Sequence, residues 1–307
     1  MNEPQSGFKV AVDMTNPGQV IACCGLLELA QRVWPGAEGW FQESQFTIAL
    51  AEKSNADAID YLVNALRSCE ISGLSQEEGD ERKVLEKESK ELKKNHSKLT
   101  PDKEKRRKEL GESARAGVIR IGEPFDLMLD WWDALSDEAT PKTWAGRQEL
   151  HRIVRAAQDA LSDIGEPMSA TLLDFRCVLR EPKEYRKGTQ DHAAVEPFYF
   201  DAGRLAHRLD VGFSLDTLGF ETAARPSVEL LCLIGLQRFR PAPNSEKKWD
   251  YDYYIWSKPL NAPVAAAVFS GVAPLPGWQK YHFHLLPRDD QKRYKAFGPA
   301  SLVGNKS

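Results

Sequence analysis

The chain contains 307 residues, of which 42% are hydrophobic and 28% are charged, and this composition is ordinary for a globular protein. Its length suits one large domain or two modest ones. No apolar run approaches the roughly 18 residues that a membrane span requires, and the first six residues lack the basic and apolar regions of a signal peptide. We therefore expect a cytoplasmic protein without a membrane partner.

The net charge of −4 conceals an uneven distribution along the chain. Residues 82–108 contain twelve Lys or Arg and five Asp or Glu, a local charge of +7, so the remainder carries −11. This distribution excludes a uniformly basic nucleic-acid-binding domain but allows local basic patches. The five cysteines are odd in number and lie partly in apolar segments, so we expect free thiols in a reducing compartment and no zinc site.

Residues 1–76 are predicted to form an N-terminal α/β unit. Apolar and polar residues alternate over 8–13, which is the period of a half-buried strand, and 46–50 predicts a second strand. Between them lies a long apolar helix, and residues 56–66 carry apolar side chains at helical spacing. This strand-helix-strand-helix order is compatible with half of a ferredoxin-like unit and equally with other α+β arrangements.

The first helix has a strong start signal. Asn16 suits the N-cap, Pro17 suits the first helical position, and Gln19 stands where a capping box places its second residue. The helix is apolar on nearly every side from Val20 to Ala30, so it is predicted to be buried.

Residues 77–116 form a charged insertion with almost no apolar periodicity. Charges of alternating sign predict two exposed helices or a partly disordered arm. The alternative is an arm whose basic end, including Lys105, Arg106 and Arg107, contacts phosphates.

Residues 117–307 are predicted to form a mixed α+β C-terminal domain with buried helices. Residues 118–129 have an extended pattern, 147–164 an amphipathic helical one, and 226–239 a second nearly all-apolar helix with Pro at its start. The fold class is therefore α+β.

A first candidate nucleic-acid contact precedes the helix predicted at 147–164. Lys142, Thr143 and Arg147 around a helix N-terminus suit a phosphate or a base edge, and Trp144 offers a stacking face. The alternative is a helix cap with a buried tryptophan anchor.

Further candidates lie toward the C-terminus. Arg204 follows an aromatic block at 198–200 whose side chains are more typical of a core. Arg238 and Arg240 follow a helix, whose C-terminus favours cations. Lys247, Lys248 and Trp249 open an aromatic-rich stretch that suits a displaced single strand, or else a strand with Trp249, Tyr251 and Tyr253 on one face.

His282 and His284 are candidate metal ligands. They would share a face of a strand, with Asp289 and Asp290 nearby, but a third ligand at a typical spacing is missing. Ordinary strand histidines are the favoured interpretation. The chain also lacks a phosphate-binding loop, a dinucleotide fingerprint and common hydrolase motifs. We therefore expect no enzymatic activity, no cofactor and no metal.

Three strings carry a family resemblance: Asn-Pro-Gly-Gln-Val-Ile-Ala-Cys-Cys-Gly-Leu-Leu-Glu-Leu-Ala at 16–30, Lys-Thr-Trp-Ala-Gly at 142–146 and Arg-Pro-Ser-Val-Glu-Leu-Leu at 225–231. Together they resemble the large (Cas-eight-type) subunit of type I-U, also called I-G, CRISPR effector complexes, in its small Csb-type variant. The resemblance covers most of the chain but leaves out residues 77–115.

The resemblance implies a non-catalytic subunit of an RNA-guided Cascade complex in antiviral defence. Such a subunit would help recognise the protospacer-adjacent motif, open double-stranded target DNA and dock the helicase-nuclease, while guide pairing reads the sequence. Its implied partners are the CRISPR backbone and guide-end-binding subunits, the guide RNA indirectly, target DNA and the helicase-nuclease.

Two alternatives remain beside this interpretation. One is an RNA-processing or metal-dependent nuclease that uses His282, His284 and the basic arm. The other is a scaffold that only bridges protein subunits, in keeping with the acidic charge outside residues 82–108.

Overall fold

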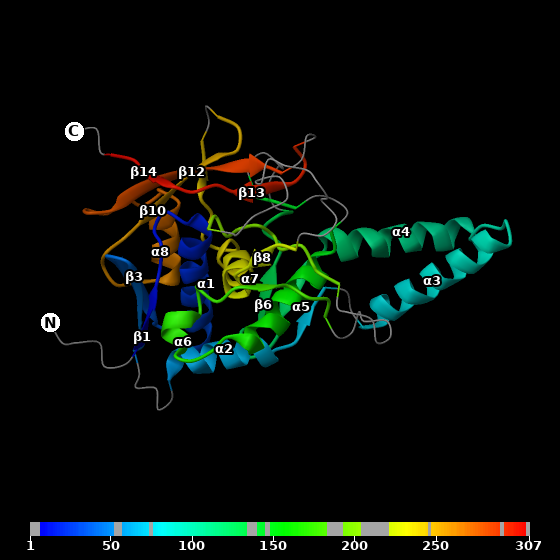
Figure 1. Cartoon of the computed structure of the whole chain (residues 1–307), viewed down its shortest axis with the longest axis horizontal. Helices are drawn as coiled ribbons and strands as arrows, with labels where there is room; N and C mark the ends of the chain where they lie inside the picture. Colours follow the sequence, from blue (N-terminus) through cyan, green and yellow to red (C-terminus); the bar gives the residue numbers. More distant parts are fainter. Residues whose placement is uncertain are drawn as a thin grey trace.

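The structure is a computed structural model that describes residues 7–51, 57–73, 76–133, 140–144, 148–182, 193–203, 221–244, 247–288 and 292–304. It has an α+β fold, which confirms the predicted class. In Figure 1 the N-terminal sheet and the C-terminal sheet lie toward one end, two buried helices occupy the middle, and a helical hairpin projects from the other end. None of the helices in the described part of the chain combines the length and the hydropathy that a membrane span requires.

The N-terminal sheet has the strand order β1-β3-β2-β11, and all neighbours are antiparallel. Its elements are β1 (Gly7–Ala11), α1 (Pro17–Val33), β2 (Glu38–Gln42), β3 (Gln45–Ala49), α2 (Ala58–Ser68) and β11 (Leu260–Asn261). Because β3 lies between β1 and β2, the first three strands and α1 form the split β-α-β arrangement found in half of a ferredoxin-like unit. The fourth strand, β11, comes from the C-terminal part of the chain.

The C-terminal sheet is built around two long antiparallel strands. Its elements are β9 (Ala242–Pro243), β10 (Asp250–Ile255), β12 (Gln279–Pro287), β13 (Lys295–Phe297) and β14 (Ser301–Leu302), with α8 (Ala262–Phe269) between β11 and β12. Tyr251, Tyr253, Tyr281 and Phe283 alternate with polar residues along β10 and β12 and are buried. This alternation gives the sheet one face in the core and one face of charged side chains.

The remaining elements lie between the two sheets in the chain order. They comprise β4 (Ile71–Ser72), α3 (Gln76–Lys94), α4 (Pro101–Ala116), β5 (Ile119–Ile121), β6 (Leu127–Leu129), α5 (Leu150–Ala160), η1 (Leu161–Asp163), α6 (Met168–Thr171), β7 (Cys177–Val178), β8 (Ala223–Ala224) and α7 (Pro226–Gly235). Strands β4 and β5 pair directly, so α3 and α4 are inserted between two neighbouring strands of one sheet. Figure 1 shows this pair of helices, here called the hairpin, extending away from the rest of the molecule.

Helices α1 and α7 pack against each other at the centre of the core. Each begins with a proline in its first turn, and both are buried on nearly all sides. A Cβ atom on Gly25 would lie 2.1 Å from the carbonyl oxygen of Leu231, and one on Gly235 would lie 2.3 Å from that of Ile21. The two glycines therefore permit a backbone approach that no other residue allows.

Several observed elements differ from the predicted ones, among them β2 and α5. Strand β2 was not predicted, because its residues Glu38–Gln42 follow a helix-terminating Trp-Pro-Gly sequence and only Gly39 and Phe41 among them are buried. The helix predicted at 147–164 begins at Leu150 and ends in a 3-10 turn. The insertion predicted at 77–116 is helical, and residues from both flanking segments share one hydrophobic core.

Candidate nucleic-acid interface

The Lys142–Trp144 loop belongs mainly to the core. Trp144 is 4% exposed and meets Trp131, Trp132 and Phe198 with ring centroids 5.3–5.6 Å apart. Thr143 is fully buried. Trp144 is thus a buried anchor, the alternative weighed from the sequence, and it presents no free face on which a base could stack. Lys142 remains half-buried, with its ammonium 5.6 Å from the centre of the Trp144 ring.

Of the two candidate tryptophans, Trp249 is the one that is not fully buried. It is half-buried, directly before β10, and two ammonium groups flank it: Lys248 Nζ lies 5.6 Å and Lys295 Nζ 5.3 Å from the ring centre. Both distances lie within cation–π range. Its φ of +69° falls in a region that bulky residues rarely adopt, and such backbone strain is concentrated at functional sites.

The fold brings the two predicted segments together through β13. The Lys295 backbone N–H donates to the Thr143 carbonyl over 2.8 Å, so the Lys142 loop lies beside the strand whose lysine covers Trp249. We call Lys142, Lys247, Lys248, Trp249 and Lys295 the Trp249 patch. Lys295 has no local signal in the sequence, because its place beside Trp249 depends on pairing between β13, β12 and the loop.

The rest of the aromatic stretch is strand, as the second interpretation had it. Tyr251 and Tyr253 share the buried face of β10 and are fully buried. Their hydroxyls donate to the carbonyls of Thr140 and Met14, respectively. These tyrosines hold the sheet to the core and are not available to nucleic acid.

Arg238 forms an ion pair inside the protein. Its guanidinium donates to the buried carboxylate of Glu28 over 2.5 and 3.2 Å, and Arg32 binds the same carboxylate. Arg238 therefore links the end of α7 to α1 while its side chain is 40% exposed, and its role as a nucleic-acid contact stays a prediction. Arg240 is half-buried. Arg147 and Arg204 lie outside the described residues.

Two of the three predicted contacts on the hairpin are also engaged in ion pairs. Arg106 donates to Glu81 over 2.9 Å and Arg107 to Glu104 over 2.7 Å. The hydrogen bond from Arg107 lowers the pKa of Glu104. Lys105 is exposed, and within the described chain it forms no ion pair. Arg106 thus joins α4 to α3, whereas Arg107 pairs within α4.

His282 lies in a charge cluster on the polar face of the C-terminal sheet. His282 Nδ1 lies 2.9 Å from Asp252 and Nε2 3.2 Å from Asp250, while Lys280 pairs with Asp252 over 2.8 Å. His284 is exposed. Among the described residues no group of three or more His, Cys, Asp or Glu side chains could hold a metal, and Asp289 and Asp290 lie outside them. The arrangement is a surface charge cluster.

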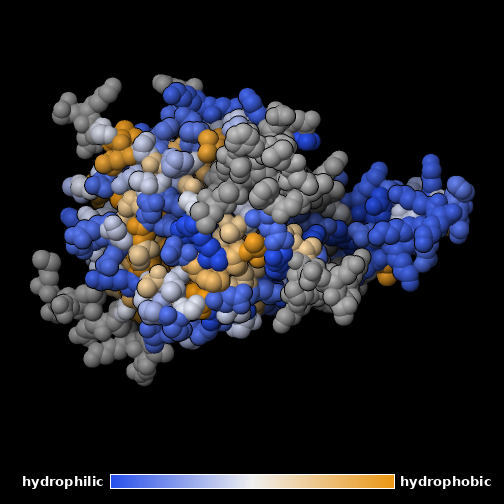
Figure 2. Space-filling view, viewed as in Figure 1, coloured by the Kyte–Doolittle hydropathy of each residue, from blue (hydrophilic) through white to orange (hydrophobic). Residues whose placement is uncertain are grey.

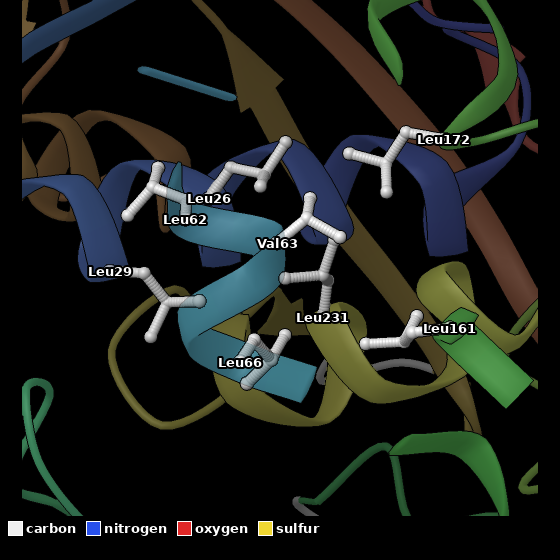
Figure 3. A pocket seen from close by; sticks show the side chains of 8 residues that line it. All are labelled: Leu26, Leu29, Leu62, Val63, Leu66, Leu161, Leu172 and Leu231. Atoms are coloured by element: carbon white, nitrogen blue, oxygen red, sulfur yellow. The ribbon is translucent and has the colours of Figure 1, made fainter. Parts of the chain in front are cut away.

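One cavity in the core has no polar group that could bind a ligand. It measures about 10 Å³, and its walls are entirely apolar side chains of α1, α2, α7 and the 161–172 segment (Figure 3). The lining residues are Leu26, Leu29, Leu62, Val63, Leu66, Leu161, Leu172 and Leu231. A space of this size without a polar group is a packing void of the core.

The first and third strings that carry the family resemblance meet in a buried polar cluster. Asn16 Nδ2 donates to Asp201 over 2.6 Å, and Arg225 donates to both oxygens of Asp201. Glu229 accepts the backbone N–H groups of Phe200 and Asp201, and burial raises its pKa to about 8. The cluster joins the N-termini of α1 and α7, so these two strings help to determine the fold.

No family model, no curated protein and no solved structure matches this chain.

Proposed function

We propose that the chain is the large subunit of a type I-U (I-G) CRISPR effector complex, a non-catalytic component of RNA-guided DNA surveillance. The proposal starts from the three strings of residues 16–30, 142–146 and 225–231. Since these strings build the α1–α7 junction and the Trp144 core, a chain that shares them is expected to share this core arrangement.

The observation that carries the nucleic-acid role is the Trp249 patch. A half-buried indole between two ammonium groups can stack on an unpaired base while the lysines neutralise adjacent phosphates. Stacking of this kind is worth about 1–3 kcal/mol per base and depends little on sequence. The patch therefore suits the opening of target DNA, where bases leave the duplex beside the adjacent motif.

The proposed partners follow from this role: the backbone and guide-end-binding subunits, the guide RNA indirectly, target DNA and the helicase-nuclease. The acidic remainder of the chain suits protein contacts better than direct nucleic-acid contact over a broad surface.

The patch is tested by Trp249→Ala in the assembled complex, with Trp278→Ala as control. Trp278 is also half-buried, but its ring is stacked on Tyr254 at 4.1 Å. We expect Trp249→Ala to weaken binding of a target with an unpaired segment by about tenfold, in line with the loss of one stacked base. The control should change binding little. Equal effects of the two substitutions would remove the patch from the interface.

Assembly is tested by co-purification of the chain with the neighbouring backbone subunits and a guide RNA. Failure to co-purify under conditions in which the other subunits assemble would contradict the proposed function. Cleavage of precursor RNA by the purified chain, abolished by His282→Ala, would instead favour the nuclease alternative.

A further inference from the structure

The charged side chains of α3 are sorted into separate faces. Buried Leu85 and Ser89 face α4, which contributes buried Leu110. Acidic Glu81 and Glu88 lie beside this inner face and pair with Arg106 and Lys103 of α4 over 2.9 and 2.7 Å. Glu81 and Glu88 thus help to hold the two helices of the hairpin together.

The outer face of α3 carries lysines. Lys83, Lys87, Lys90 and Lys94 follow one another at intervals of four, three and four residues, so they lie on one face. At about 100° per residue this face is roughly 150° around the helix from the buried one. We call Lys87, Lys90 and Lys94 the lysine stripe. All three are exposed, and none of them forms an ion pair with any residue that the structure describes.

Acidic neighbours do not neutralise the stripe. Glu86 is bound by Arg82 over 3.0 Å, and Glu88 by Lys103. Glu91 is exposed and flanks the stripe. Lys98, in the turn that follows α3, is exposed as well and adds charge at the end of the hairpin. The stripe therefore retains a local positive charge.

We propose that the lysine stripe binds the phosphate backbone of a nucleic-acid duplex without reading its sequence. That the stripe binds a polyanion follows from its charge alone; that this polyanion is nucleic acid rests on the proposed function. Lys87 and Lys94 are seven residues apart, or about 10 Å along the helix. A duplex presents about one charge per 1.7 Å of its axis, so this span faces about six phosphate charges.

The position of the stripe makes it the natural contact for a polyanion. In Figures 1 and 2 the hairpin extends from the body and presents a hydrophilic surface over most of the side in view. The hairpin, residues 76–116, carries a net charge of +2 and the rest of the chain carries −6, so the body repels a duplex and the lysine stripe attracts one. Such a contact holds flanking duplex at a distance from the acidic body, on the side of the molecule away from β1 and β3.

The proposed contact lies on α3 and not on the basic end of α4, where the sequence placed it. Arg106 and Arg107 looked more suitable from the sequence, because they belong to the densest run of basic residues. In the folded hairpin both donate to carboxylates, and breaking those ion pairs would offset part of any gain from binding phosphate. The stripe lysines can bind phosphate without first breaking an ion pair to a described residue.

The test compares the full chain with two triple variants of equal net charge. One is Lys87→Gln, Lys90→Gln and Lys94→Gln, which keeps good helix-forming residues in α3. The control is Lys9→Gln, Lys258→Gln and Lys292→Gln, three exposed lysines of the body. The probe is a fluorescent duplex of arbitrary sequence, titrated by anisotropy between about 50 and 200 mM salt.

We expect the stripe variant to bind the duplex at least about tenfold more weakly, with a salt slope reduced by about 3, since each lost phosphate contact removes about 0.9. The control variant should change affinity by less than about threefold. Equal losses in both variants would overturn the inference, as would a wild-type chain that fails to bind duplex or that binds polyglutamate instead. The stripe variant should still co-purify with the effector subunits. If the wild-type chain fails to assemble with them but binds the duplex as expected, the proposed function is contradicted and the stripe inference is not.

Discussion

Asn16 and Glu229 show how single buried polar groups determine the centre of this fold. The side chain of Asn16 accepts the Gln19 and Ala202 backbone N–H groups and donates to Asp201. Glu229 sits across from it, in the first turn of α7, and is 1% exposed. Each group satisfies backbone donors that would otherwise be buried without partners.

We expect Asn16→Ala to lower the free energy of unfolding by about 3 kcal/mol, because it removes an N-cap and also a buried hydrogen bond to a carboxylate. Asn261→Ala is the matched control. Asn261 also caps a helix, accepting from Val264 over 3.1 Å, but at an exposed site. It should cost about 1 kcal/mol. Equal costs in urea denaturation would show that the contact to Asp201 contributes nothing.

Glu229 should make the stability of the protein depend on pH. Its pKa in the folded protein is raised by burial from an ordinary value of 4.5 to about 8. Between these values the folded state binds the proton more tightly than the unfolded state, so stability is highest near the lower value and falls as the pH rises toward 8.

Relative to Glu229→Gln, which does not titrate, the wild type should lose up to about 1.4 kcal/mol per pH unit across this window. Urea denaturation of both proteins at several pH values measures the difference. A constant difference from pH 5 to about 8 would show that the carboxyl group does not titrate there.

At the scale of elements, the contact between α1 and α7 is the tightest constraint. We expect Gly25→Ala to destabilise the protein by more than about 3 kcal/mol, because the added Cβ would lie 2.1 Å from a backbone oxygen. Gly165→Ala is the control, since its Cβ would meet no atom within 4 Å. It should change stability by less than about 1 kcal/mol. Similar thermal midpoints for the two variants would mean that the helices can separate freely.

The hairpin should be dispensable for folding. Strands β4 and β5 pair directly, so a short Gly-Ser connection can replace residues 76–116 without opening the sheet. The replacement also removes the ion pair between Arg82 and Glu149 at the base of the hairpin. We expect the midpoint of thermal unfolding to fall by no more than about 5 °C, which circular dichroism measures. Failure of the shortened chain to fold would show that the hairpin is part of the core.

Elements with strong local signals could be predicted from the sequence, and contacts between distant segments could not. The cap at Asn16, the apolar runs of α1 and α7 and the alternation in β10 are properties of neighbouring residues, and they marked those elements correctly. Strand β2 depends on pairing with β3 and β11, so its own short sequence gave no signal.

The candidate site shows the same limit. Basic and aromatic residue types were visible in the sequence, but the partners of their side chains were not. Arg238 is paired with Glu28 from a helix about 200 residues earlier, while Lys295 reaches Trp249 only through sheet pairing. A row of lysines on α3 was present in the sequence, yet its significance depends on which face packs on α4.

At the scale of the whole molecule, charge is separated between arm and body. The hairpin carries the exposed lysine stripe, the body carries the acidic excess, and the Trp249 patch is a local basic surface at the β10–β13 side. The proposed division of labour follows from this: the arm holds duplex backbone, the patch engages unpaired bases, and the acidic body meets other protein subunits.

The most direct test of a DNA-sensing subunit is electrophoretic binding of target duplexes by effector complex assembled with and without this chain. Each complex is offered duplexes that differ only in the adjacent motif. We predict that complex containing the chain prefers the correct motif and that complex lacking it does not. Equal discrimination by both complexes would contradict the account.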